Sequence, residues 1–365
     1  MGFRCGIIGL PNVGKSTIFN ALTAAGAEVA NYPFCTIDPN VGIVPVPDQR
    51  LEKIAELLKP SKVTYATMEF LDIAGLVQGA SRGEGLGNKF LGHIREVDAV
   101  VHIVRCFEDP SVVHINGAID PVRDIEIINT ELLLADLETL DKRITKIERL
   151  AKSGDKTARR EIEVCRELQT ALGRGSPARN ISMRDEERDI MKDLHLLTAK
   201  KVLYVANVSE SHLKGNRGYV EKIETITEKE GTTVIVICGD LESEISELPK
   251  DERQIFLNDL GLKESGFEKL IREGYDLLNL ITFYTTVGPE LRAWTIPTGT
   301  RTPSAAGRIH SDMEKGFIRA EIIHYDNFMA IGSMTKAKEQ GLVRSEGKEY
   351  ILCDGDIAYF RFNVS

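Results

Sequence analysis

Residues 9–17 read Gly-Leu-Pro-Asn-Val-Gly-Lys-Ser-Thr and match the phosphate-binding loop pattern G-x-x-x-x-G-K-[ST]. The apolar run Phe3–Ile8 before them is typical of a buried parallel strand, and residues 17–25 have helical spacing. A strand, a glycine-rich turn and a helix place backbone N–H groups and the positive end of the helix around a phosphate. The stretch therefore predicts a nucleoside triphosphate site, with Lys15 on the β- and γ-phosphates and Ser16 on Mg²⁺.

The composition is that of a soluble globular protein. The chain has 365 residues, 42% hydrophobic and 28% charged, with a net charge of −9. This acidic balance argues against wholesale wrapping of nucleic acid, although local basic faces remain open. The six cysteines form no C-x-x-C pair, and no apolar run reaches the ~18 residues of a membrane span. Because the first strand follows the first residues directly, we expect no signal peptide and a cytoplasmic protein without a membrane segment.

Strand and helix patterns alternate along the first 280 residues. Strand patterns at 3–8, 41–46, 65–73, 98–106, 201–207 and 233–238 predict an α/β domain with a doubly wound, mostly parallel sheet over residues 1–280. Residues 125–172 show only helical spacing, broken at 153–155, which predicts an antiparallel, coiled-coil-like helical hairpin inserted over about 124–198. Short β-rich runs at 282–286, 292–296, 317–323, 350–352 and 358–362 predict a separate domain of β-grasp type over 281–365.

Two further elements favour a GTPase-like switch. Thr36 lies in a polar loop twenty residues after Ser16, where such switches place a Thr that completes the Mg²⁺ shell. The motif that runs from Asp72 to Gly75 ends a strand, which predicts that Asp72 binds Mg²⁺ through water and that the Gly75 N–H lies near the γ-phosphate. A metabolic kinase of this fold would need an Arg-bearing lid, and the sequence shows no sign of one.

The base-reading position departs from the GTPase pattern N-K-x-D. The chain has Asn207, Val208, Ser209 and Glu210 there, so the Lys that lies over guanine is missing and the acid is one methylene longer. An unpaired polar edge costs about 1–3 kcal/mol, or roughly ten- to a hundredfold in affinity. We therefore expect adenine in place of guanine. The alternative is that Asn207 is only a strand-end turn residue.

The sequence also predicts slow hydrolysis. Leu76 follows the D-x-x-G motif, where many GTPases have a Gln that orients the attacking water. His114, in the loop at 109–121, is the nearest candidate by residue type, with an ordinary loop histidine as the alternative. Lys15 is the second candidate catalytic residue. Asn12 offers another route, because its side-chain oxygen could hold K⁺ beside the phosphates.

Two groups of basic residues allow partner contacts. The hairpin carries basic side chains interleaved with acids, which fits either a contact surface or a solvated helical face. In the last domain, a local positive excess near Trp294 suits RNA or an acidic partner, unless this is an incidental surface around a core tryptophan. The residues of the second group are Arg292, Arg301, Arg308, Lys315 and Arg319.

Taken together, these residues resemble the YchF-type Obg-like ATPases, a branch of the Obg group of P-loop GTPase-fold proteins. The resemblance covers the chain in order and rests on the phosphate loop, on NYPFCT at 31–36, on the run 72–91, on NVSE at 207–210, and on RAWT at 292–295 with GFIRAE at 316–321. It implies a G domain, a helical insert and a C-terminal TGS domain. It also implies slow ATP hydrolysis with Mg²⁺ and association with the ribosome, either its large subunit or the whole particle.

The resemblance also implies roles for single residues. Ser16 and Thr36 bind Mg²⁺, Asn207 and Val208 line the base, Leu76 is the family's hydrophobic replacement of Gln, and His114 is the loop histidine that assists hydrolysis. The implied phosphate contacts are Asn12, Val13, Gly14, Lys15, Ser16 and Thr17. One departure is the second base-side loop, which reads Cys-Gly-Asp at 238–240 in place of Ser-Ala.

We therefore predict a slow ATP-hydrolysing switch that acts as a monomer, with RNA contact through the TGS domain and the helical insert. Three alternatives remain open at this point: a GTPase or dual-specificity hydrolase, a non-hydrolysing nucleotide-sensing scaffold, and an RNA-binding protein with a vestigial nucleotide site. The acidic net charge disfavours the last of these.

Overall fold

The computed structural model describes residues 3–27, 40–73, 87–112, 114, 117–213 and 217–363. These residues divide into two compact units. The first, here called the N-terminal unit, contains Phe3–Val44 and Glu69–Leu270. The second, the C-terminal unit, contains Pro45–Met68 together with the chain from Ile271 onward.

The N-terminal unit is built on a sheet of six described strands in the order β2-β4-β1-β5-β6-β7. Strands β1, β5, β6 and β7 pair in parallel, which accounts for the continuous apolar runs that the sequence shows there. Backbone hydrogen bonds from Val46 to Ala66 and from Asp72 to Asn40 show that β2 and β4 are antiparallel. The strands are β1 (Phe3–Ile8), β2 (Val41–Pro45), β4 (Thr67–Asp72), β5 (Ala99–Arg105), β6 (Lys201–Asn207) and β7 (Val234–Ile237).

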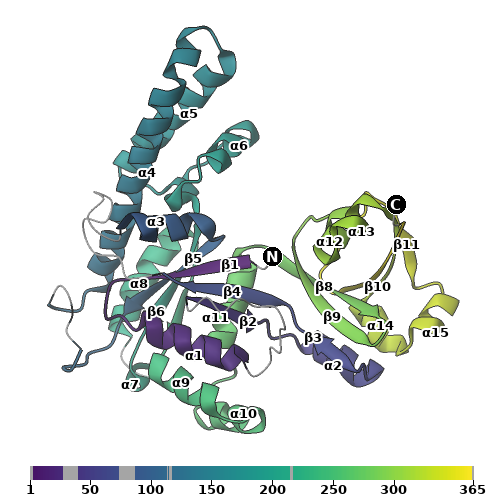
Figure 1. Cartoon of the computed structure of the whole chain (residues 1–365). Coiled ribbons are helices and arrows are strands. Elements are labelled where there is room, and N and C mark those ends of the chain that lie inside the picture. The colour runs from purple at the N-terminus through teal and green to yellow at the C-terminus, as the bar shows by residue number, and fades with distance from the viewer. Residues whose placement is uncertain are drawn as a thin grey trace. The chain divides into compact units, whose positions relative to one another are not determined.

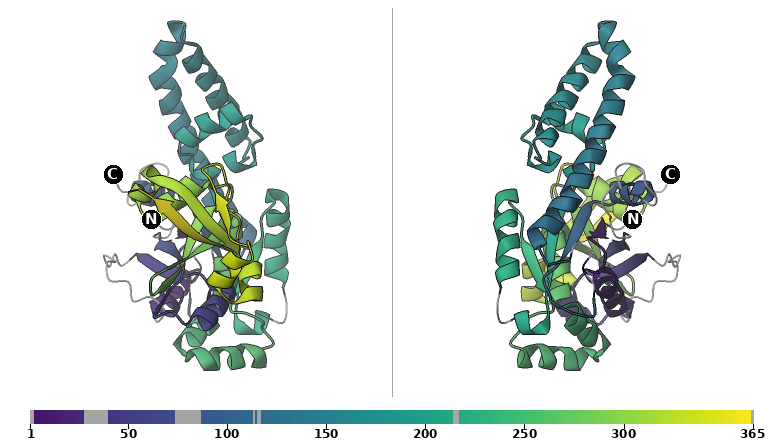
Figure 2. Two further views of the ribbon diagram at one scale, coloured as in Figure 1. Left: turned by 90° about the vertical axis from the view of Figure 1, so that its right-hand side faces the viewer. Right: turned by 90° about the vertical axis from the view of Figure 1, so that its left-hand side faces the viewer.

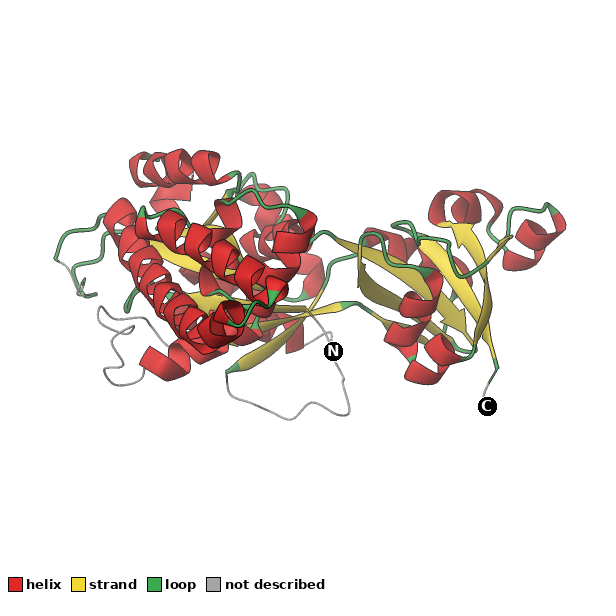
Figure 3. Ribbon diagram, turned by 90° about the horizontal axis from the view of Figure 1, so that it is seen from above, coloured by secondary structure: helices red, strands yellow, loops and turns green. Residues whose placement is uncertain are grey.

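Helices cover both faces of this sheet (Figure 3). Helices α1 and α9 pack on one face, whereas α3, α4 and α8 lie on the other (Figure 1). The helices are α1 (Lys15–Ala27), α3 (Gly87–Glu96), α4 (Pro121–Lys152), α5 (Lys156–Gly173), α6 (Asp185–Asp193), α7 (Glu210–Leu213), α8 (Gly218–Glu230), α9 (Gly239–Glu247) and α10 (Lys250–Asp259). Helix α11 (Gly266–Leu277) begins in this unit, and its residues from Ile271 onward belong to the C-terminal unit.

Helices α4 and α5 form a long hairpin between β5 and β6, and they lie side by side in both views of Figure 2. The turn between them contains Gly154 at φ +100°, and Asp155 caps α5 by accepting from the Ala158 N–H. At the base of the hairpin, the buried Asp136 accepts from the backbone N–H groups of Leu197 and Thr198 at 2.8 and 2.7 Å. These bonds join the hairpin to the short 3-10 helix Leu197–Ala199 that precedes β6.

The C-terminal unit contains a second sheet, with its six described strands in the order β11-β10-β12-β8-β9-β3. Its strands are β3 (Lys62–Thr64), β8 (Leu280–Val287), β9 (Glu290–Pro297), β10 (Phe317–His324), β11 (Arg344–Glu346) and β12 (Asp356–Phe362). Its helices are α2 (Gln49–Leu58), α12 (Thr302–Ile309), α13 (Ser311–Lys315), α14 (Tyr325–Ile331) and α15 (Met334–Glu339).

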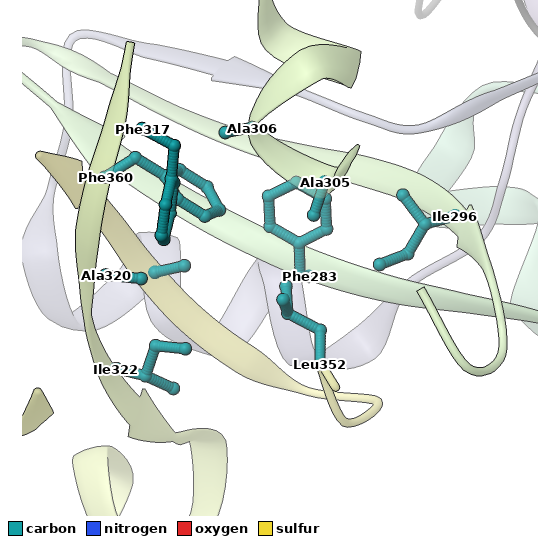
Figure 4. Packing of buried hydrophobic residues seen from close by; sticks show 10 residues of the cluster. Phe283, Ile296, Ala305, Ala306, Phe317, Ala320, Ile322, Leu352 and Phe360 are labelled. Atoms are coloured by element: carbon teal, nitrogen blue, oxygen red, sulfur yellow. The ribbon is translucent and has the colours of Figure 1, made fainter. Parts of the chain in front are cut away.

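Aromatic side chains fill the core of the C-terminal unit (Figure 4). Phe360 meets Phe283 edge to face, with ring centroids 5.9 Å apart, and Phe317 at 6.4 Å. Trp294 packs against this cluster and donates from its indole N–H to the Thr285 hydroxyl. Trp294 is therefore partly buried at the edge of this core, and Arg292 stacks on its ring at 4.0 Å.

The structure corrects two sequence predictions. The segment Pro45–Met68, which we assigned to a first domain of residues 1–280, packs with the C-terminal unit, and that unit begins at Ile271. Within it β3 pairs with β9, Arg50 contacts Asp354 at 2.7 Å, and the Tyr284 hydroxyl donates to Asp48. The run at 350–352 is not a strand, because Ile351 makes only an isolated bridge with Arg301.

Candidate functional site

The phosphate loop follows β1 and leads directly into α1 (Figure 1). Two of its glycines are required by their surroundings. A Cβ on Gly9 would lie 2.5 Å from the Ile103 carbonyl oxygen, and one on Gly14 would lie 2.2 Å from the side-chain amide nitrogen of Asn207. Gly14 also has φ +90°, and Asn12 adopts φ +62°, a conformation that Asn tolerates better than most residues. The loop backbone is therefore held in a tight, specific turn.

The side chains of the loop differ in exposure. Asn12, Ser16 and Thr17 are exposed, whereas Val13 is buried in the core. Lys15 is only 8% exposed, and its Nζ donates to the Leu10 carbonyl oxygen at 2.7 Å. Burial lowers the pKa of Lys15 to about 8, partly opposed by the nearby negative charge of Asp72. The Lys15 side chain, with its lowered pKa, therefore lies at the position predicted for the phosphates.

Asp72 ends β4 and lies beside the first turn of α1. The Ser16 hydroxyl donates to Asp72 Oδ2 at 3.3 Å, while Asp72 Oδ1 is buried without a hydrogen-bond partner. A hydroxyl and an incompletely satisfied carboxylate at this distance fit Mg²⁺, which takes oxygen ligands and retains several waters. The structure thus brings these two predicted metal residues together. The other one, Thr36, and the predicted γ-phosphate contact Gly75 lie outside the described residues, as does Leu76.

Asn207 joins the phosphate loop to the base-side loop. Its side-chain amide donates to the Val13 carbonyl oxygen at 2.9 Å, and its Oδ1 accepts from the Gly239 N–H at 3.1 Å. Asn207 is thus buried, and both ends of its amide are used within the protein. A strand-end turn residue would need neither bond, so the structure disfavours that alternative for Asn207.

The remaining base-side residues differ in the exposure of their side chains. Val208 is 2% exposed, and its N–H donates to the Ile237 carbonyl oxygen at 2.8 Å. Its side chain therefore offers little surface to a base. Glu210 is exposed at the start of α7, where it is accessible to a ligand. Cys238 is buried, and Gly239 begins α9 directly after β7.

His114 lies in a more closed environment than a loop position suggests. Its side chain is 4% exposed, and Nε2 lies 2.9 Å from Oδ2 of Asp124, a buried residue in the first turn of α4. Sequence reasoning missed Asp124, because the partner of a loop histidine is determined by tertiary packing. A carboxylate at one ring nitrogen fixes the tautomer and orientation of an imidazole.

Arg105 is a second residue that sequence reasoning missed. It ends β5 and is 2% exposed. It donates hydrogen bonds to main-chain carbonyl oxygens of the turn that follows β5 and of the phosphate loop. One of these carbonyls belongs to Asn12 in the phosphate loop, at 3.5 Å. A signal was present in the sequence, since a charged residue at the end of an otherwise apolar central strand is unusual.

Several residues of the two predicted basic surfaces pair with acids. On the hairpin, Arg143 lies 2.5 Å from Glu161, and Arg160 contacts Glu163 and Glu187. Lys142 and Lys152 pair with acids one helical turn away. In the C-terminal unit, Arg301 pairs with Glu349 and Arg319 lies 3.9 Å from Glu321. Pairs of this kind are compatible with either interpretation of the hairpin, a contact surface or a solvated helical face.

Comparison with known proteins identifies the family. A model described as a 50S ribosome-binding GTPase matches residues 4–149, and the C-terminal model of the YchF GTPases, described as a protein of unknown function, matches residues 280–363. The "Ribosome-binding ATPase YchF" of Bacillus subtilis (strain 168) is 54% identical over 100% of both chains. That of Escherichia coli O157:H7 is 50% identical, also over 100% of both. The chain belongs to the YchF family.

A solved YchF structure supports the fold assignment. The Schizosaccharomyces pombe YchF GTPase superposes with a TM-score of 0.90 at 37% identity, covering 99% of this chain and 98% of that one. The predicted P-loop GTPase-like α/β fold and the YchF resemblance are therefore confirmed. In the described parts of the chain, no helix combines the length and apolar character needed to cross a membrane.

The names of the YchF relatives disagree on the nucleotide. The bacterial relatives are named ATPases, whereas the fission-yeast structure and the model over residues 4–149 are named GTPases. The phosphate loop cannot resolve this difference, because it contacts only groups that ATP and GTP share. The preference for ATP or GTP must therefore come from the base side of the site, at Asn207, Glu210 and Gly239.

Proposed function

We propose that this protein is an ATP-binding, slowly ATP-hydrolysing molecular switch that acts with the ribosome. The observation that carries the proposal is the pairing of a complete phosphate loop with the base-side residues Asn207, Val208 and Glu210 in place of N-K-x-D. The YchF relatives from B. subtilis and E. coli, named ribosome-binding ATPases, support it at 54% and 50% identity over their full length.

Mg²⁺ is the proposed cofactor. Ser16 and Thr36 would bind it directly and Asp72 through water, which agrees with the 3.3 Å contact between Ser16 and Asp72 and with the unsatisfied Asp72 Oδ1. When bound, the ion neutralises charge on the β- and γ-phosphates. The contacts of the chain itself with the phosphates come from Asn12, Val13, Gly14, Lys15, Ser16 and Thr17, with the Gly75 N–H at the γ-phosphate.

Hydrolysis is proposed to be slow because Leu76 can neither donate nor accept a hydrogen bond to water. His114 is the candidate group that assists it, oriented by Asp124 at 2.9 Å. Because both side chains are buried, this role requires the segment that carries His114 to expose the ring to the attacking water. K⁺ held by the exposed Asn12 is the proposed alternative, and unchanged hydrolysis when Na⁺ replaces K⁺ would remove it.

Adenine specificity follows from what the base side presents. Val208 exposes almost no side chain and Asn207 uses its amide within the protein, whereas Glu210, in the motif that replaces N-K-x-D, is exposed and is the group proposed to read the base. A carboxylate accepts from the adenine N6 amino group. Its extra methylene moves it away from the position that Asp takes against guanine in GTPases.

The partner proposals rest on the family relationship. The C-terminal unit is proposed to be a TGS domain of β-grasp type, and the α4–α5 hairpin to be the family's helical insert. Ribosome contact, through the large subunit or the whole particle, is proposed to use these two elements, with RNA as the contacted molecule. We also propose that the chain acts as a monomer in the cytoplasm.

Nucleotide titrations test the proposal directly. ATP and GTP are titrated into the purified protein with Mg²⁺, and turnover of each is measured with and without ribosomes. Tighter binding of GTP would overturn the base-reading argument and favour the GTPase or dual-specificity alternative. Absent turnover of both nucleotides, with ATP-dependent ribosome binding retained, would favour the non-hydrolysing scaffold. Strong salt-dependent RNA affinity without ATP would favour the vestigial-site alternative.

A further inference from the structure

Arg105 is the centre of the turn that follows β5. Its Nε donates to the Phe107 carbonyl oxygen at 3.1 Å, and its two Nη atoms donate to Val112 at 3.0 Å and to Asp109 at 3.3 Å. The guanidinium also stacks on the Phe107 ring, 4.5 Å from its centroid. Residues 107–112 are therefore wrapped around one buried cation.

The same guanidinium reaches the phosphate loop. The Nη1 atom that donates to Val112 also lies 3.5 Å from the Asn12 carbonyl oxygen. Asn12 is an exposed loop residue in the left-handed region, at φ +62°, so this contact is made to a backbone conformation that few residue types adopt. A planar guanidinium can contact several carbonyls at once because its five donors have fixed directions.

A buried cation at this place is costly to keep. Removing a charge from water costs several kcal/mol, and an apolar side chain of similar volume is often neutral or stabilising at such positions. The four hydrogen bonds of Arg105 go to main-chain carbonyls, which orient the guanidinium without cancelling its charge. This arrangement is better suited to holding backbone segments together than to adding stability.

The two segments that Arg105 joins are both parts of the proposed hydrolysis site. Asn12 lies on the phosphate side, and the turn at 107–112 leads within two residues to His114. We propose that Arg105 is a positioning residue for ATP hydrolysis, which keeps the phosphate loop at Asn12 and the segment carrying His114 in one relative geometry. This inference rests on the proposed function.

The proposal predicts a specific kinetic signature. Arg105 is buried and reaches the phosphate loop through the Asn12 main-chain carbonyl oxygen, so its loss should affect the alignment of the reacting groups more than nucleotide binding. Lysine keeps the positive charge but cannot contact Asn12, Asp109 and Val112 together. Because misplacement by about 1 Å can cost about a hundredfold in rate, we expect kcat of Arg105→Lys to fall about ten- to a hundredfold, with the ATP Kd within about threefold.

The test is a double-mutant cycle in the full-length protein. ATP hydrolysis and ATP affinity are measured for Arg105→Lys, His114→Ala and the double variant. The matched control is Arg217→Lys, which changes an exposed arginine that pairs with Glu224 on α8. If Arg105 acts through His114, the double variant is no slower than His114→Ala alone, because the effects are not additive. The control should keep the wild-type kcat.

Several results would overturn the inference. An unchanged kcat in Arg105→Lys, losses that multiply in the double variant, or a loss of affinity equal to the loss of kcat would each contradict it. Thermal unfolding and ADP binding show whether Arg105→Lys is folded. If it is not, Phe107→Leu removes the stacking partner at a half-buried position, and a wild-type kcat in that variant overturns the inference.

The outcomes also separate this inference from the proposed function. If the wild-type protein does not hydrolyse ATP, the proposed function fails. If His114→Ala hydrolyses ATP at the wild-type rate, the proposed role of His114 fails, and this inference fails with it. If both of these hold and Arg105→Lys is as fast as the wild type, only the role of Arg105 is wrong.

Discussion

On the phosphate side of the site, Asn12, Ser16 and Thr17 are exposed on a backbone held in a tight turn, whereas on the base side Asn207 and Val208 are buried. The phosphate side therefore presents polar groups to a ligand. The base side uses its polar groups within the protein, as the bonds of Asn207 to Val13 and Gly239 show. The two sides are connected by Asn207, so the base-side loop supports the phosphate loop even before a base is bound.

This difference separates affinity from selectivity. Phosphates are bound by backbone N–H groups, one lysine and a metal ion, which make no distinction between ATP and GTP. Selectivity depends on few groups because most of the base side is already packed, and the exposed acids among its described residues are Glu210 and Asp240. Changes on the phosphate side should weaken both nucleotides together, and only changes at the exposed base-side acids should alter their ratio.

The largest effect is expected for Lys15→Ala. Removing the buried cation deletes a charge-assisted contact with the phosphates, which typically costs about 3 kcal/mol or more, at least a hundredfold in Kd. ATP and GTP should weaken by the same factor, measured by calorimetric titration of each nucleotide. A loss of less than fivefold, with the fold intact by circular dichroism, would contradict the assignment of Lys15 to the phosphates.

Asn207→Ala should weaken both nucleotides by about ten- to a hundredfold. It leaves the Val13 carbonyl and the Gly239 N–H without their partner, and an unsatisfied buried group costs about 1–3 kcal/mol. The free energy of unfolding, measured with urea, should fall by a similar amount. Asn207→Asp is the matched control, since it can still accept from Gly239 but cannot donate to Val13. A changed ATP-to-GTP ratio in Asn207→Ala would show that Asn207 reads the base directly.

Glu210→Asp should shift the ratio of the ATP and GTP affinities toward GTP by about tenfold. The carboxylate of the shorter acid comes closer to the position that the Asp of N-K-x-D takes against guanine in GTPases. One hydrogen bond to a charged group is worth about 1.5 kcal/mol or more. Competition titrations with both nucleotides measure the ratio. Glu221→Asp, the same change at an exposed position on α8, should leave the ratio unchanged. An unchanged ratio in Glu210→Asp would exclude Glu210 as the base-reading acid.

The smallest expected effect is a pH dependence of ATP affinity. Burial lowers the pKa of Lys15 to about 8, so above that pH the free protein carries an uncharged Lys15 that must take up a proton to pair with phosphate. ATP Kd should stay constant from pH 6.5 to 7.5 and rise by about five- to tenfold at pH 9. Lys15→Arg, which keeps its charge, should show weaker but pH-independent binding. A constant wild-type Kd up to pH 9.5 would contradict the lowered pKa.

Much of the N-terminal unit follows from local sequence patterns. The apolar runs predicted β1, β5, β6 and β7 to within about one residue, because a strand buried on both faces needs a continuous apolar sequence. The break at 153–155 predicted the turn between α4 and α5 for a similar local reason. Gly154 supplies the positive φ, and Asp155 caps the next helix.

Other features could not be predicted, because they depend on contacts between distant residues. The segment Pro45–Met68 joins the C-terminal unit through contacts such as that of Thr64 with Glu290 at 2.6 Å, 226 residues away. The buried environment of His114 depends on Asp124, which lies in the first turn of α4. The run at 350–352 has a strand-like composition, but Tyr350 donates to the buried Asp356 in place of extending a sheet.

The sequence by itself determined the family, the sheet and the phosphate loop. The loop follows from a local pattern, because its two glycines, lysine and serine stand at fixed spacing within eight consecutive residues. Only the tertiary structure decided how the site is held. The bond of Asn207 to Val13 spans 194 residues, and Arg105 contacts Asn12 across 93. Hydrogen bonds between such distant residues leave no periodic pattern in a sequence, since the fold alone brings their atoms within reach.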